Sequence, residues 1–260
     1  MIFGGGGGSA KIPTSAADRD NQAISAVKAA ISKPKTKDFP LIECEFPPLK
    51  ELNKLGDGSL RSANEVDQAN LAFCIKMVKS IAPIPIMGPK IWLLTSSAST
   101  NAFVAKAQGA AKGTAATVDT LRNGIPQGLA KGDICILISP TGRPDYNLAQ
   151  TIITNNSDTT TQKNAVVIVN GLAKDPESVP GTATMAYFLK PLTYNSMVSG
   201  FLIRSYPGPW TVLDAVTKKS LGSFTDQEIL FQESNTPDLR SSGRLVQKAT
   251  DERAIAARKR

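Results

Sequence analysis

The chain has 260 residues and a mass of 27.5 kDa, and its 30 Lys and Arg against 22 Asp and Glu give a net charge of +8. This length fits one large domain or two small ones, because single hydrophobic cores stop growing at roughly 250–300 residues. A hydrophobic fraction of 41% is typical of globular domains, and no apolar run approaches the roughly 20 residues needed to cross a bilayer. The chain contains no histidine, which excludes Ser-His-Asp and Cys-His catalysis and His-ligated zinc or haem.

Three cysteines, Cys44, Cys74 and Cys135, lie far apart among apolar residues, and no CxxC pair occurs. This placement predicts buried free thiols in a reducing compartment rather than a disulfide framework. The first eight residues, MIFGGGGG, lack the charged and apolar regions of a signal peptide, so we expect a cytosolic, stromal or already processed chain. Five consecutive glycines lose too much entropy on ordering to form a phosphate cradle, and we interpret residues 1–17 as a flexible leader.

The N-terminal half begins with a predicted helix and a predicted strand. Apolar residues recur every three or four positions over Asp18–Ile31, which indicates an amphipathic helix. Apolar and polar residues alternate over Phe39–Phe46, which predicts a half-buried strand with Glu43 and Glu45 on its solvent face. Two carboxylates so placed could form a general acid and base pair, but an exposed strand face is the simpler interpretation.

The middle of the chain alternates predicted helices and strands. A capping box, Ser62 with Glu65, opens a helix that continues to Ile81. The elements predicted next are a strand at 90–95, a helix at 99–108, a possible strand at 114–118, a strand at 132–139, a helix at 145–153 and a strand at 164–170. The continuous β-branched runs among them are typical of strands covered on both faces, so this region predicts a parallel sheet with right-handed crossovers.

Beyond Gly171 the pattern changes to strands without helices between them, at 183–189, 197–206 and 210–217. Pro, Gly and Asn turns separate these strands, which predicts an antiparallel meander that extends the same sheet. We therefore predict a three-layer α/β fold for residues 18–235, a single domain with a mixed sheet in which a parallel strand-helix-strand core is followed by an antiparallel C-terminal meander.

The strongest predicted strand is followed by the loop SPTGRPD, residues 139–145. Ligands of open α/β sheets collect beyond the carboxyl ends of strands, so Ser139, Arg143 and Asp145 form a candidate pocket, with Arg143 holding an anion. The same loop also fits an ordinary strand-to-helix turn with Asp145 as the N-cap. The nearby GAAKGT at 109–114 lacks the order of a Walker A motif, which argues against ATP hydrolysis by that route.

Residues 236–260 form a basic C-terminal extension that carries +4 of the total charge. Its cations are candidate partner-docking residues: Arg240, Arg244, Lys248, Arg253, Arg258, Lys259 and Arg260. The basic segments contain no aromatic residues for base stacking, so we expect no nucleic-acid partner, and the charge suits an anionic membrane or an acidic protein surface. We expect this tail to be poorly ordered in isolation, and deletion of residues 249–260 to leave the fold intact.

The most specific stretch is YFLKPLTYNSMVSGFLIRSYPGPWTVL, residues 187–213. Its aromatic-Leu-Lys-Pro-Leu strand, its Gly200 before an apolar run and its PGPW turn resemble a family of chloroplast and cyanobacterial proteins with a conserved domain of unknown function. That family includes the low-photosystem-II-accumulation assembly factors. The resemblance extends more loosely to Gln22–Phe46 and to the ILISPTG strand end. It supplies no catalytic motif, so no active site is carried over.

The resemblance implies a place and partners. We expect a non-enzymatic peripheral subunit or assembly factor in the chloroplast, docked on the stromal face of the thylakoid membrane at a photosystem, in particular as an extra subunit of photosystem I in red-lineage algae such as diatoms. Partners would be photosystem core subunits, light-harvesting antenna proteins and the thylakoid surface. We predict no cofactor or metal, although Asn, Gln, a backbone carbonyl or water could contact chlorophyll. The alternative is an α/β enzyme that binds a small molecule or nucleotide at the loop 139–145.

Overall fold

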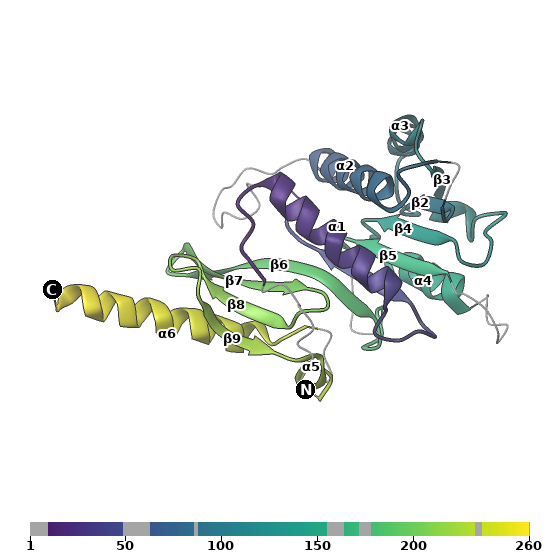
Figure 1. Ribbon diagram of the computed structural model, residues 1–260. Coiled ribbons are helices and arrows are strands. Elements are labelled where there is room, and N and C mark those ends of the chain that lie inside the picture. The colour runs from purple at the N-terminus through teal and green to yellow at the C-terminus, as the bar shows by residue number, and fades with distance from the viewer. Residues whose placement is uncertain are drawn as a thin grey trace.

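A computed structural model describes residues 10–48, 63–85, 88–154, 164–171, 178–231 and 236–259. Within these ranges nine strands form one sheet in the order β3-β2-β4-β5-β1-β6-β7-β8-β9 (Figure 1). The elements in chain order are α1 Ala16–Ser32, β1 Leu41–Glu45, α2 Ala63–Ile81, β2 Ile91–Thr95, α3 Asn101–Ala111, β3 Ala116–Thr120, the 3-10 helix η2 Leu121–Asn123, β4 Ile134–Ile138, α4 Arg143–Thr154, β5 Ala165–Val169, β6 Thr184–Tyr194, β7 Met197–Ser205, β8 Trp210–Asp214, β9 Ser220–Phe224, α5 Asp226–Phe231 and α6 Leu239–Arg258.

The sheet is parallel from β3 to β6 and antiparallel from β6 to β9. This confirms the predicted mixed sheet. β2, β4 and β5 are the continuous apolar runs of the sequence, and every residue in them is buried. β1 lies between β5 and β6, so that one short strand joins the parallel half of the sheet to the antiparallel half.

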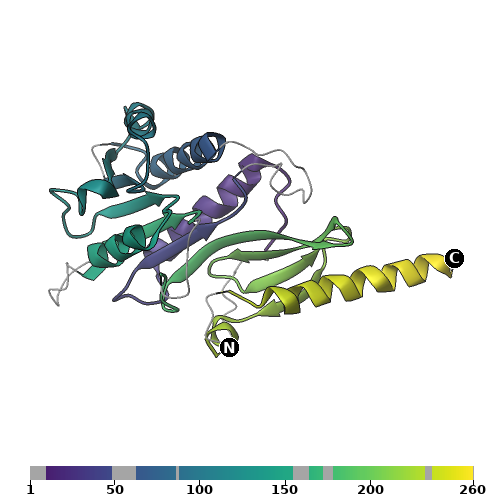
Figure 2. The same ribbon diagram turned by 180° about the vertical axis from the view of Figure 1, so that it is seen from behind.

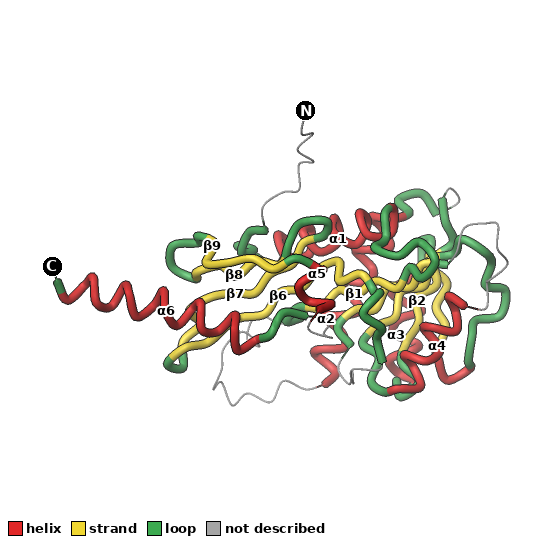
Figure 3. Tube along the Cα trace, turned by 90° about the horizontal axis from the view of Figure 1, so that it is seen from below, coloured by secondary structure: helices red, strands yellow, loops and turns green. Residues whose placement is uncertain are grey.

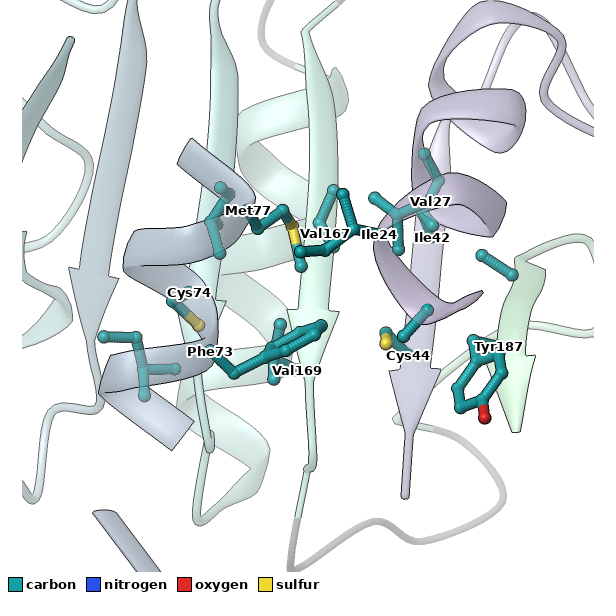
Figure 4. Packing of buried hydrophobic residues seen from close by; sticks show 14 of the residues in the cluster. Ile24, Val27, Ile42, Cys44, Phe73, Cys74, Met77, Val167, Val169 and Tyr187 are labelled. Carbon is teal, nitrogen blue, oxygen red and sulfur yellow. The ribbon is translucent and has the colours of Figure 1, made fainter. Parts of the chain in front are cut away.

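Helices cover both faces of the sheet (Figures 1 and 3). Side chains of α1, α2 and α3 form one core with the strands beneath them, and α4 packs on the other face. On the antiparallel half, α6 covers the face opposite α1. Successive residues of β7 show this: Leu202 packs in a cluster with Val246 of α6, whereas Ile203 packs in the cluster that contains α1. The close view in Figure 4 shows side chains that meet in the first core: Ile24, Val27, Ile42, Cys44, Phe73, Cys74, Met77, Val167, Val169 and Tyr187.

The structure corrects the expectation for β1. We expected Glu43 and Glu45 on an exposed face, yet Glu43 is only 4% exposed and Glu45 is half-buried. The physical reason is position in the sheet. An alternating sequence predicts a strand with one face exposed to solvent. In the structure β1 is the middle strand of nine, and helices pack over both of its faces.

Further differences concern the N-terminal segment and two short elements. Of the predicted leader, residues 1–9 lie outside the described residues, whereas Ala10 and Ile12 pack against the core and Ser15 caps α1. Ser62 of the predicted capping box also lies outside them. The short elements β9 and α5 were not predicted, because β9 is a partly exposed edge strand without clear alternation and α5 has only six residues.

The C-terminal tail is a helix of 20 residues rather than a poorly ordered segment. The side chain of Asp238 accepts hydrogen bonds from the backbone N–H groups of Arg240 and Ser241, which caps the helix start. Val246 is buried on the sheet, and this tertiary contact stabilises a helix that the sequence alone makes weak. The last turns of α6 extend past the end of the sheet (Figures 1 and 2).

The three cysteines are free and buried, as predicted. Burial raises the pKa of Cys74 far above its ordinary value and that of Cys135 to about 12, so neither thiol forms a reactive thiolate near neutral pH. None of the helices in the described ranges is both long and apolar enough to cross a membrane.

The packing of α6 on the sheet depends on Gly200. A Cβ atom at this position would lie 2.4 Å from Cγ2 of Val246 and 2.9 Å from the carbonyl oxygen of Leu213. We expect Gly200→Ala to lower the free energy of unfolding by about 1–3 kcal/mol, because the helix must move off the sheet. The matched control is Gly243→Ala, where a Cβ meets no atom within 4 Å. Because Ala forms helices better than Gly, this change should raise the free energy of unfolding, by at most about 1 kcal/mol. Urea unfolding measures both. Equal effects of the two alanines would contradict this packing.

Candidate functional site

The predicted loop 139–145 lies at a topological switch point of the sheet. The chain leaves β2 outward to β3 and leaves β4 inward to β5, so the crevice between the ends of β2 and β4 is where ligands bind in open α/β folds. Here the crevice is filled by Asp145, which is fully buried. One of its carboxylate oxygens accepts hydrogen bonds from Ser96 Oγ at 2.6 Å and Thr141 N at 3.1 Å, and the other accepts from Ser97 N at 3.0 Å.

These hydrogen bonds join the ends of β2 and β4 and leave Asp145 no free edge toward solvent. Arg143 is exposed, at the start of α4. Ser139 is buried and faces a different set of residues, accepting a hydrogen bond from Asn70 of α2 at 2.5 Å. The structure therefore does not bring the three predicted residues together, and the role it gives Asp145 is to hold strand ends.

A substitution at Asp145 tests this role. Asp145→Asn keeps the shape but turns an NH₂ group toward a donor of Ser96, Ser97 or Thr141, so we expect a loss of about 1–3 kcal/mol of unfolding free energy. Arg143→Gln, at an exposed position, should change it by less than about 0.5 kcal/mol. Thermal or urea unfolding measures both variants. A stability of the Asp145→Asn variant equal to that of the wild type would mean that this carboxylate is not a structural anchor.

A second site lies at the carboxyl ends of β1 and β5. Its inner wall is a buried chain of polar contacts. Ser139 Oγ accepts from Asn70 Nδ2 at 2.5 Å, Asn70 Oδ1 accepts from Asn170 Nδ2 at 2.8 Å, and Asn170 Oδ1 accepts from the backbone N–H of Phe46 at 2.7 Å. This chain links the ends of β4, β5 and β1 to α2. Such satisfied networks fix the positions of their members.

Beside this chain lies a cavity of about 570 Å³, which we call the β1-end pocket. It falls in the size range of small-molecule sites, roughly 300–1,000 Å³. Its wall is mostly apolar and comes from β1, α2, the end of β5 and β6. The lining residues are Glu45, Phe46, Pro47, Pro48, Val66, Asp67, Asn70, Asn170, Gly171, Phe188, Leu189, Lys190 and Pro191.

Asp67, in the second turn of α2, is the notable charge of the β1-end pocket. Its side chain is partly buried, and within the described ranges it makes no hydrogen bond or ion pair. Burial raises the pKa of its carboxyl group. Lys190 at the rim is exposed to solvent. A partly buried carboxylate without a partner in an apolar wall is a feature that ligand sites show more often than structural ones.

The third site is the free end of α6. The helix is fixed at the end of the sheet by two contacts: the guanidinium of Arg253 pairs with the buried carboxylate of Asp214, and Tyr194 Oη donates a hydrogen bond to Asp251 at 3.1 Å. Beyond Arg253 the described residues of the helix are exposed. The cations predicted to dock a partner fall into two groups. Arg253 is paired with Asp214 of the sheet. The others among the described residues are exposed: Arg240, Arg244, Lys248, Arg258 and Lys259. Arg260 lies outside the described residues.

Apolar side chains accompany these cations. Met197 at the start of β7, Val216 in the turn after β8 and Ile255 on α6 are 68%, 70% and 54% exposed. Met197 pairs with Tyr194, whose hydroxyl reaches α6, and Val216 lies two residues after Asp214, which pairs with Arg253. We call this surface the α6 tip. It consists of the three apolar side chains, the cations Arg258 and Lys259 at the end of the helix, and Lys218 and Lys219 in the turn after β8.

The Arg253–Asp214 pair affects how the tip can be tested. Burial raises the pKa of Asp214, but hydrogen bonds from the backbone of Thr217 and Val216 and from Arg253 outweigh it, so the net pKa is lowered. A deletion of residues 249–260 would remove Arg253 along with the free end. The deletion expected to be neutral for the fold is therefore 254–260.

We expect Arg253→Met to lower the unfolding free energy at pH 7 by about 1 kcal/mol, a value reduced by the partial exposure of the guanidinium. A lowered folded pKa gives stability that is present above the unfolded value, about 3.9, and is lost as pH falls. The gap between the wild type and the variant should therefore close as the pH falls below the unfolded value and Asp214 becomes protonated in the folded protein. Denaturant unfolding at pH 7 and at low pH measures this, and a gap that persisted in acid would contradict the pairing.

Sequence reasoning missed the β1-end pocket. Phe46 and Asn170 are the last residues of two predicted strands, and the carboxyl ends of parallel strands share one edge of a sheet, so this signal was available. Asp67 and Asn70 carried no comparable signal, because on a helix of mixed sequence they resemble ordinary polar positions.

Comparison with known proteins identifies the family. Residues 13–239 match the family described as a domain of unknown function (DUF1995), and the chain belongs to it. No curated protein and no solved structure shows a significant match. The match covers the whole sheet and ends at the first residue of α6.

Proposed function

We propose that this chain, as a member of the DUF1995 family, is a non-enzymatic peripheral subunit or assembly factor that docks on the stromal face of a photosystem, in particular photosystem I. The sequence resemblance to chloroplast and cyanobacterial proteins supports the proposed location in the chloroplast. The α6 tip supports the mode of attachment. The proposed partners are photosystem core subunits, antenna proteins and the thylakoid surface around them.

The observation that carries this proposal is the combination of charge and exposed apolar surface at the α6 tip. The family match ends at residue 239, so it includes only the first residue of this helix. Its base is fixed to the sheet by Arg253 and Tyr194, and its end projects past the sheet (Figures 1 and 2). A helix held at its base presents its free end without a large loss of entropy on binding.

The cations favour an acidic partner. Exposed Lys and Arg steer association with negative surfaces, and each contributes about 1 kcal/mol near an anionic membrane. The apolar side chains Met197, Val216 and Ile255 would then be buried in the contact. Self-association through this surface is disfavoured, because it would bring two sets of like charges together.

We do not propose a nucleotide-binding enzyme that works from the loop 139–145. The oxygens of Asp145 are occupied by Ser96, Ser97 and Thr141, and Arg143 lies apart from it on the surface.

The test of the docking proposal uses charge-matched variants. Arg258→Gln with Lys259→Gln removes two cations from the α6 tip, whereas Lys106→Gln with Lys112→Gln removes two exposed cations beside α3, at the far end of the sheet. Retention on isolated thylakoid membranes is measured over a salt series. We expect the tip variant and the deletion of 254–260 to lose retention at low salt and the α3 variant to keep it. Wild-type retention should fall as the Debye length shrinks from about 10 Å at 0.1 M to about 3 Å at 1 M.

Mass spectrometry of purified photosystem complexes then identifies the partner. Recovery of the chain with photosystem I would support the finer proposal, and recovery with photosystem II only would redirect it. Equal retention of all variants at every salt concentration would mean that docking uses another surface.

A further inference from the structure

The β1-end pocket exists because two adjacent strands differ in length. β1 stops at Glu45, and Pro47 and Pro48 lead the chain away, while β6 continues to Tyr194. From Leu189 onward the edge of β6 that faced β1 therefore has no described strand beside it. Pro191 has no N–H to offer at this edge, so the space is poorly suited to an added strand and is open to a ligand that fits between side chains.

The walls of the pocket are held in place by hydrogen bonds and a ring contact that its own lining residues make. Arg19 of α1 donates hydrogen bonds to the carbonyl oxygens of Pro47 at 2.8 Å and Pro48 at 3.2 Å, and its guanidinium lies 4.5 Å from the ring centre of Phe46. The Asn70–Asn170 contacts fix the opposite wall. A pocket fixed in this way needs little ordering when a ligand binds, which lowers the cost of binding.

The charges of the described lining residues sum to a negative value, in a protein whose net charge is +8. Glu45 and Asp67 are acidic, and Lys190 is exposed and extends toward solvent. Arg19, behind the wall, pairs with Asp20, with Nη2 and Oδ1 2.7 Å apart, and Lys76 Nζ lies 2.5 Å from the other oxygen of the same carboxylate. The carboxylate of Asp67 is the partly buried charge of the pocket, and it makes no hydrogen bond or ion pair with a described residue.

We propose that the β1-end pocket binds a small amphipathic amine, a molecule with an apolar ring or chain and one ammonium group, with the apolar part between Phe46, Val66 and Leu189 and the ammonium on Asp67. The apolar part gains from burial at about 25 cal/mol per Å². The ammonium forms a charge-assisted hydrogen bond with a carboxylate that has no other partner among the described residues. An anionic ligand would instead meet the charge of Asp67.

This inference goes beyond docking on a photosystem and does not depend on it. The pocket lies at the junction of β1 and β6, whereas the α6 tip lies at the outer end of the antiparallel strands. The two proposals can therefore fail separately.

The experiment uses three probes with the same apolar body: phenylbutylamine, phenylbutanol and phenylbutyrate. Binding to the full chain is followed by ¹⁵N NMR at neutral pH, with the side-chain amide signals of Asn70 and Asn170 as local reporters. We expect the amine to shift both signals with a Kd at least tenfold below that of phenylbutyrate, a difference of about 1.4 kcal/mol, and the alcohol to fall between them.

Two variants and one control define the site. Asp67→Asn keeps the volume and removes the charge, and it should reduce the preference for amine over acid to less than about threefold, which is under 1 kcal/mol. Val66→Trp fills the pocket and should weaken all three probes. Glu252→Gln, an equal change of charge on α6, should leave binding unchanged.

The proposal is overturned by any of three results: phenylbutyrate that binds as tightly as the amine, a preference for the amine that survives Asp67→Asn, or no shift at Asn70 and Asn170 with the amine at about 1 mM, where even a weak site of about −4.1 kcal/mol is half filled. Asp67→Asn decides the matter even if Val66→Trp disturbs folding, because Asp67 makes no hydrogen bond or ion pair with a described residue that the fold could lose.

Discussion

The insertion of β1 between β5 and β6 is the constraint on which the rest of the structure depends. This five-residue strand pairs along one edge with Val166–Val169 and along the other with Thr184–Phe188, so its backbone hydrogen bonds join the parallel and antiparallel halves into one sheet. Helix α1 packs over this junction and contacts both β1 and β6. Because β1 is covered on both faces, even an acidic residue such as Glu43 is buried in it.

The carboxyl edge of the parallel strands is closed by polar side chains at two places and open at a third. Asp145 joins the ends of β2 and β4, and the Ser139–Asn70–Asn170 chain joins β4 and β5 to β1. Buried polar groups are costly unless they are paired, so these networks specify how the strand ends meet. The β1-end pocket remains where β1 has ended and β6 has not, and there the carboxylate of Asp67 has no described partner.

The antiparallel half serves a different purpose, since it supports α6. Gly200 lets Val246 approach the sheet, and the pairing of Arg253 with Asp214 fixes the helix where the sheet ends. Trp210, which ends the PGPW turn, is buried against Phe188 with ring centres 5.2 Å apart, so the same strands connect the helix to the core. The helix therefore extends past the sheet beyond Arg253, with the cations of its end exposed to solvent.

Local patterns of hydrophobic and turn residues were enough to predict several elements. The runs ICILI and AVVIV predicted buried parallel strands, the Pro and Gly turns after Gly171 predicted the meander, and the cysteines were predicted to be free and buried. Features that depend on neighbours far along the chain could be seen only in the folded protein. It placed β1 at the centre and buried Glu43, it filled the predicted loop site with Asp145, it brought Asp67 and Phe188 to one pocket, and it held α6 as a helix through Val246. The reason is that hydrophobic period and turn chemistry act over a few residues, whereas strand order, burial of a charge and the shape of a pocket follow from contacts between residues that lie far apart along the chain.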